Sequence, residues 1–222
     1  MEYKQLMKFD EKLRSFSKEY LSMVAVGSIV TGDPYIQGRS DKDIVLIFNT
    51  DPLNLIKNLE QVVKESDFDE SYVFTPIPKS EFGNPDSKYT FSNKFRSKTL
   101  FGEDFVATAK LPEKKKINEI YMKGLTSTSH QIYNHIINSG IWSKEKVSHE
   151  FWKDFKHVFM YLAIREYYIT EDYPKTRKEI AQRLNISEIN ETFNILHSID
   201  NQPKEKIVIC AKDLMKYIVN LK

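Results

Sequence analysis

The sequence predicts an α+β protein, with a mixed helix-and-strand core over residues 1–110 and an all-helical half over residues 111–222. Short apolar runs rich in β-branched residues, which are typical of buried strands, occur in the first half. After about Pro112 these runs nearly vanish, and apolar residues recur at the three- and four-residue spacing of a helix. Because the pattern changes once, we place a domain boundary near residue 111.

The first strands follow an N-terminal helix. Residues 3–20 carry apolar side chains among charges at helical spacing and predict an amphipathic helix. The apolar run at 23–26 predicts a buried strand that ends at Gly27. Glycine and proline between residues 31 and 40 indicate a loop. The continuous apolar run at 44–48 is expected for a central strand that is covered on both faces.

A third strand and two further helices complete the predicted core. Residues 52–64, which begin with a proline, predict a helix. Residues 72–75 predict a strand, and Pro76 and Pro78 either end it or mark it as an edge strand. Another helix is predicted over residues 89–99.

The second half is predicted to be helical, apart from one short strand-like run around Cys210. Five helices are expected, around residues 117–136, 151–162, 176–185, 187–199 and 211–220. A single cysteine excludes an internal disulfide, and Cys210 within its apolar run is interpreted as a small core residue.

The overall charge is nearly balanced. The chain has 33 Lys and Arg residues against 31 Asp and Glu, a net charge of +2 with neutral histidines. A strongly basic nucleic-acid-binding protein would have a larger excess, so the charge favours no polymer partner and excludes none. The N-terminus has no apolar leader, and no apolar run approaches the roughly 18 residues of a membrane helix. We therefore expect a cytoplasmic protein without a membrane partner.

Asp41 and Asp43 stand where the second predicted strand begins. Side chains alternate along a strand, so their carboxylates are expected side by side on one face, with Lys42 on the other. Two adjacent carboxylates repel each other, which is costly unless a cation lies between them. Oxygen ligands that are shared with substrate phosphates suit Mg²⁺. Asp41 and Asp43 are therefore predicted to be metal ligands.

Gly27 and Ser28 provide the complementary half of the predicted site. A glycine after a buried strand lets the backbone approach a ligand, and the backbone N–H groups and the Ser28 hydroxyl can donate to phosphate oxygens. Because Gly27 and Ser28 precede Asp41 and Asp43 at this spacing, we favour a metal site at the two aspartates over the alternative of a charged loop. Arg39 and Ser40 are further candidates for phosphate contact, and the alternative is a turn in which Ser40 orients Asp41.

These residues carry a resemblance to a known superfamily. Segments 27–32 and 38–44 resemble the DNA polymerase β-like nucleotidyltransferases, and they are most similar to the aminoglycoside adenylyltransferase branch. Segment 96–102, a Leu-aromatic-Gly turn after a helix, is similar to the same branch. The resemblance implies a nucleotidyltransferase core with a mixed sheet, followed by a helical C-terminal domain.

The resemblance also implies an activity. It is the Mg²⁺-dependent transfer of a nucleoside monophosphate from a nucleoside triphosphate, with ATP as the expected donor, to a hydroxyl group of a small molecule. Asp41 and Asp43 would be the catalytic residues that bind Mg²⁺, and Gly27 and Ser28 would hold the phosphates. Metal ions would orient the triphosphate and stabilise charge on the attacking and leaving oxygens.

The chain departs from the family's pattern in two ways. Lys42 stands between the aspartates where an apolar residue is usual, which requires a polar or exposed opposite face. The family also places a third carboxylate on the next strand, and residues 72–77 contain none. The candidate substitutes near the ends of that strand are Asp69, Glu70, Glu81 and Asp86. Without a substitute, nucleotide binding with little turnover is expected.

Two other functions stay open. The same fold could transfer the nucleotide to RNA or to a protein, as in the toxin and antitoxin branches of the superfamily. Alternatively, the chain is a nucleotide-binding or regulatory module whose helical half mediates an interaction. Residues 176–199 resemble a helix-turn-helix, but acidic side chains in its second helix would repel DNA phosphates, so an accessory helical pair is favoured. We expect an acceptor site at the junction of the two halves.

Overall fold

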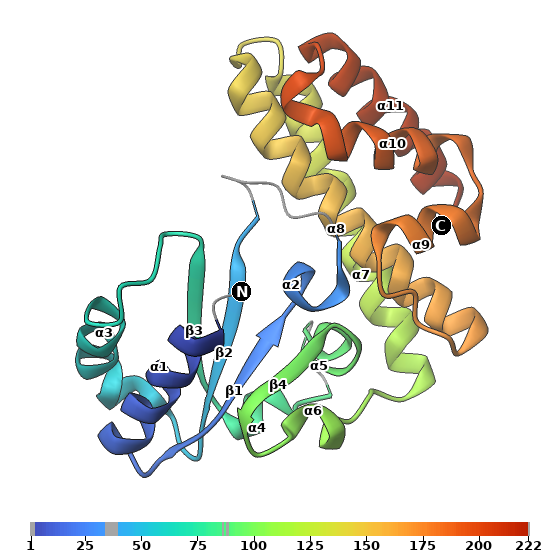
Figure 1. The fold of residues 1–222 in the computed structure, drawn as a ribbon. Coiled ribbons are helices and arrows are strands. Elements are labelled where there is room, and N and C mark those ends of the chain that lie inside the picture. Colours follow the sequence, from blue (N-terminus) through green and yellow to red (C-terminus); the bar gives the residue numbers. More distant parts are fainter. Residues whose placement is uncertain (1–2, 34–39, 86, 88, 222) are drawn as a thin grey trace. The chain divides into compact units, whose positions relative to one another are not determined.

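The structure is a computed structural model that describes residues 3–33, 40–85, 87 and 89–221. Contacts divide the chain into two units, Met1–Pro112 and Glu113–Lys222. The first unit contains a sheet with helices on its faces, and the second consists of helices (Figure 1).

The sheet of the first unit has four strands in the order β3-β2-β1-β4. The strands are β1 (Tyr20–Val26), β2 (Lys42–Phe48), β3 (Tyr72–Pro78) and β4 (Ser97–Gly102). β1 is antiparallel to both β2 and β4, whereas β3 runs parallel to β2. The predicted mixed sheet is therefore confirmed.

Alternation along the strands separates two cores. One core packs beneath α1 (Tyr3–Phe16) and α3 (Ile56–Lys64), which follows the short 3-10 helix η1 (Pro52–Leu55) (Figure 1). Its central side chains are Leu6, Phe9, Leu13, Met23, Ile44, Leu46 and Phe48. The other core contains Val24, Ile47, Phe82 and Ala109. Short helices contribute to that side: α4 (Lys79–Phe82), α5 (Thr90–Phe95) and α6 (Phe105–Thr108).

The fourth strand contradicts the predicted helix over residues 89–99. The helix ends at Phe95, and the Ser97 hydroxyl donates hydrogen bonds to the backbone carbonyls of Ser92 and Asn93. The chain then pairs with β1 and ends its strand at Gly102, where a Cβ would lie 2.2 Å from the Leu21 carbonyl oxygen. The pairing makes the Leu-Phe-Gly segment the end of a strand. Glycine is needed at its last position, because a side chain there would overlap the neighbouring backbone.

β3 continues past the predicted end at residue 75. Pro76 and Pro78 are opposite Leu46 and Phe48 in the parallel ladder, so they do not stop the strand. β3 lies at the edge of the sheet, which is the position where proline is tolerated. The interpretation of the prolines as marks of an edge strand is confirmed.

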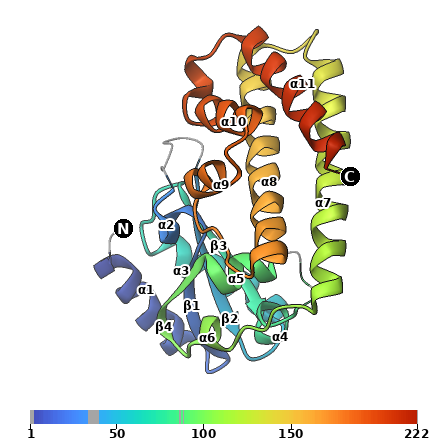
Figure 2. The same cartoon turned by 90° about the vertical axis from the view of Figure 1, so that its right-hand side faces the viewer.

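Helices make up the described part of the second unit. They are α7 (Lys114–Asn138), α8 (Lys144–Thr170), α9 (Arg177–Leu184), α10 (Ser187–Ser198), η2 (Ile199–Asn201) and α11 (Lys204–Asn220). Figure 2 shows α7 and α8 side by side, with α11 packed against them. The strand-like run around Cys210 lies inside α11, because its apolar residues are buried at helical spacing.

The two longest helices approach each other at Gly124. A Cβ at Gly124 would lie 1.9 Å from the Tyr161 ring, so α7 and α8 pack closely only because this side chain is missing. In the described part of the chain, no helix has the length and apolar character needed to cross a membrane.

Candidate functional site

The predicted phosphate-binding glycine and the second predicted metal ligand lie next to each other. Val26, the last residue of β1, is paired with Asp43 near the start of β2, so the chain leaves β1 beside that carboxylate. Gly27 has a φ of +77°, and a Cβ built on it would lie 3.6 Å from Asp43 Oδ2. The antiparallel pairing therefore brings Gly27 and Asp43 together.

The alternation of β2 separates Lys42 from Asp43. Ile44 packs in the core beneath α1, whereas Val45 and Ile47 pack against the other core, on the face that Asp43 shares. The Lys42 ammonium lies on the first face, 3.4 Å from Asp69 Oδ2 and 4.3 Å from the centroid of the Tyr72 ring. Lys42 therefore has polar and aromatic partners on the face of the sheet opposite Asp43.

The other predicted site residues belong to the segments that follow β1 and precede β2. Asp41 is exposed and directly precedes β2, and Ser40 before it is buried. Ser28 is half-buried and begins α2 (Ser28–Thr31), a single turn that ends at Gly32 with a φ of +74°. Arg39 lies outside the described residues.

An ion pair beside Gly27 was missed from the sequence. The Arg96 carbonyl accepts a hydrogen bond from the Gly27 N–H at 2.7 Å, and Arg96 Nη2 donates to Asp33 Oδ2 at 2.8 Å. The Asp33 side chain is 1% exposed and that of Arg96 is 17% exposed. The sequence signal was weak, because an aspartate next to a proline usually indicates a turn. The Gly27 N–H is thus already committed to the Arg96 carbonyl.

A comparison with solved structures identifies a relative of this fold. The chain is similar to spectinomycin adenyltransferase AAD(9) from Enterococcus faecialis, whose crystal structure contains ATP and spectinomycin. The TM-score is 0.58 at 13% sequence identity, over 97% of this chain and 98% of that chain. The two chains therefore share a fold. No family model matches the chain, and no curated protein matches its sequence.

An apolar residue occupies the position beside Asp43 on the next strand. The parallel ladder pairs Asp43 with Val73, a residue that is 39% exposed. Paired residues of neighbouring strands point to the same face. A carboxylate at position 73 would therefore stand beside that of Asp43.

The three candidate substitutes that the structure describes, Asp69, Glu70 and Glu81, do not complete a three-ligand cluster. No group of three His, Cys, Asp or Glu side chains that could hold a metal ion occurs among the described residues. Asp69 contacts Lys42, and hydrogen bonds from the Ser71 hydroxyl and N–H lower the pKa of Asp69. It is therefore engaged on the Lys42 face. Glu70 and Glu81 join no such group, and Asp86 lies outside the described residues.

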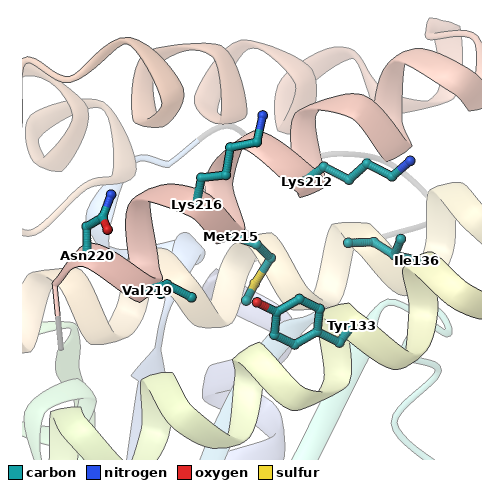
Figure 3. A pocket seen from close by; sticks show the side chains of 7 residues that line it. All are labelled: Tyr133, Ile136, Lys212, Met215, Lys216, Val219 and Asn220. Carbon is teal, nitrogen blue, oxygen red and sulfur yellow. The ribbon is translucent and has the colours of Figure 1, made fainter.

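A groove of about 610 Å³ lies in the second unit, between α7 and α11 (Figure 3). Its lining residues are Tyr133, Ile136, Lys212, Met215, Lys216, Val219 and Asn220. None of the predicted site residues lines it, so the groove is separate from the residues that carry the nucleotide prediction.

Proposed function

We propose that the chain is a Mg²⁺-dependent nucleotidyltransferase that moves a nucleoside monophosphate, with ATP as the expected donor, to a hydroxyl group of a small molecule. The observation that carries the proposal is the approach of Gly27 to the Asp43 carboxylate at the paired ends of β1 and β2. The fold likeness to an adenyltransferase crystallised with ATP supports the choice of nucleotide and acceptor class.

The residues present fit a metal ion that is shared with substrate. Mg²⁺ in nucleotide sites uses one or two carboxylates together with phosphate oxygens and waters, so it does not need an all-protein cage. Asp41 and Asp43 are both exposed and supply two such carboxylates. When bound, Mg²⁺ would polarise the phosphate oxygens and fix their orientation.

The segment after β1 would hold the triphosphate. Because Gly27 has no side chain, a phosphate can approach the backbone beside Asp43. The Ser28 hydroxyl and N–H would donate to phosphate oxygens, since the first N–H groups of a helix have no partner within that helix. The acceptor oxygen would then bond to the α-phosphorus, and pyrophosphate would leave.

A second function is favoured by one observation. Val73 occupies the position opposite Asp43, so the described site has no third carboxylate to bind metal or remove the acceptor's proton. Loss of such a group costs orders of magnitude in rate. A nucleotide-binding module with little turnover is therefore the alternative. Like the transferase, it is expected to bind Mg²⁺-nucleotide, but it is not expected to transfer the nucleoside monophosphate to an acceptor.

Calorimetry and a transfer assay test both functions. ATP, GTP, CTP and UTP are titrated with Mg²⁺ or with EDTA into the wild type, Asp41→Asn, Asp43→Asn and the control Asp69→Asn. Asp69 is a carboxylate on the opposite face of the same sheet edge, so its variant controls for loss of charge. We expect Mg²⁺-dependent binding that both site variants lose and the control retains.

Pyrophosphate release is then measured with a panel of hydroxylated small molecules. Release with one acceptor supports the transferase, and binding without release supports the module. If the folded wild type binds no nucleotide in the presence of Mg²⁺, both proposals are wrong.

A further inference from the structure

We infer that Arg96 and Asp33 are positioning residues, which hold the phosphate-binding segment Gly27–Asp33 in place without contacting the nucleotide. The inference deepens the proposed function and rests on it for the role of the segment. Its physical basis lies in the contacts of Arg96, in the burial of the pair and in the weakness of the segment on its own.

Arg96 contacts both ends of the segment. Ser97 is paired with Val26 across β4 and β1, so the preceding residue, Arg96, lies beside Gly27. Its backbone carbonyl accepts the Gly27 N–H, and its guanidinium pairs with Asp33 six residues further along. Arg96, which directly precedes β4, therefore contacts both the first and the last residue of the segment.

The segment has little internal structure, so its position depends on contacts with the rest of the unit, which are the Arg96 contacts and the packing of Ile29 and Val30 against the core. α2 is a single turn of four residues, and isolated turns of helix are unstable. Gly27 and Gly32 flank it with positive φ values, which glycine adopts without strain. A flexible joint at each end would leave the direction of the Ser28 hydroxyl undetermined without outside contacts.

The burial of the pair indicates a role in geometry more than in stability. Both charges are largely removed from water, and Arg96 Nε is buried with no hydrogen-bond partner among the described residues. A buried ion pair of this kind contributes little net stability, but loss of one charged partner is costly for the other. Asp33 also accepts a hydrogen bond from the Thr31 hydroxyl at 3.4 Å, inside the same segment. Removing either charge is therefore expected to move the segment.

The test uses Arg96→Gln, Asp33→Asn and the double variant, with Arg14→Gln as the matched control. Arg14 pairs with Asp10 on α1 in the same unit, so the control breaks an Arg–Asp pair away from the segment. Mg²⁺-ATP affinity is measured by calorimetry at a temperature where circular dichroism shows every variant to be folded.

A positioning pair makes a specific prediction for affinity. Each single variant weakens binding by about 10- to 100-fold, as is typical when residues that support a metal site are changed. The double variant is no worse than either single variant, because both changes release the same segment. The control binds like the wild type.

Other outcomes overturn the inference. If Arg96 contacts phosphate directly, Arg96→Gln weakens binding. Asp33→Asn then does not weaken it, because the loss of the Asp33 charge leaves the Arg96 guanidinium available to the phosphate. If the pair only stabilises the fold, the variants unfold at lower temperature and bind with unchanged affinity when folded.

Hydrogen exchange without nucleotide separates this inference from the proposed function. The N–H groups of Val30, Thr31 and Gly32 donate hydrogen bonds within the segment. Arg96→Gln and Asp33→Asn are expected to speed their exchange at least about tenfold, while α1 peptides stay unchanged. Unchanged exchange in the segment contradicts the inference even if ATP binds, and faster exchange supports it even if the wild type binds no nucleotide.

Discussion

Val73 on β3 lies directly opposite Asp43 on β2 in a parallel ladder, so the two side chains share one face of the sheet. Val73→Asp would therefore place a new carboxylate beside Asp43. We expect it to strengthen Mn²⁺ binding, measured by electron paramagnetic resonance, because a further oxygen ligand joins the pair. Val73→Asn has the same shape without the charge and should bind Mn²⁺ like the wild type. Equal affinity of the two variants would show that position 73 does not face the metal site.

Gly27→Ala and Gly32→Ala form a second matched pair. Gly32 lies in the left-handed region, with a φ of +74° and a ψ of 14°, so an alanine there should lower the free energy of unfolding by about 1–2 kcal/mol. Gly27, with a φ of +77° and a ψ of −140°, lies in a region that only glycine adopts readily, so an alanine there should cost more. Only the Cβ at position 27 approaches a predicted site residue, since nothing lies within 4 Å of a Cβ at Gly32. Chemical denaturation should therefore show a larger loss for Gly27→Ala than for Gly32→Ala. In the folded variants, Mg²⁺-ATP affinity should fall in Gly27→Ala much more than in Gly32→Ala.

Cys210 is predicted to react slowly in the folded protein. Burial raises the pKa of its thiol to about 11, so little thiolate exists at pH 8, and the side chain is buried in α11. Alkylation followed by mass spectrometry should be slow in buffer and fast in denaturant. Because the folded pKa lies above the ordinary value of about 8.5, the thiol's contribution to stability is complete below about pH 8.5 and is lost as the pH rises through 11. Rapid native alkylation at pH 8 would contradict this burial.

Gly124→Ala should destabilise the second unit. The new methyl group would overlap the Tyr161 ring, so the ring or the two helices have to shift. Overpacking of this kind costs about 1–3 kcal/mol, and thermal unfolding measures it. Gly140→Ala is the control, because its Cβ would be 3.9 Å from the nearest atom. Tyr161→Leu combined with Gly124→Ala should recover part of the loss, since the smaller side chain makes room.

The parts of the fold that the sequence predicted have local causes. Strands β1 and β2 come from contiguous apolar runs, and the opposite faces of Lys42 and Asp43 follow from the two-residue repeat of a strand. The long helices α7 and α8 follow from apolar residues at a helical period.

The parts that were missed depend on contacts that are distant in the chain. β4 lacks a distinctive apolar run and becomes a strand through pairing with β1. Asp33 and Arg96 are 63 residues apart, so nothing local links them. The placement of Val73 opposite Asp43 depends on the register of β3 against β2. In each case the deciding interaction is tertiary, which a single sequence does not display.

The prolines of β3 have a consequence for how the protein behaves at high concentration. An edge strand with free N–H groups can recruit a strand from another molecule, and this is a common start of aggregation. Pro76 and Pro78 lie in the outermost strand and have no N–H to donate, so that border of the sheet is a poor template for self-association.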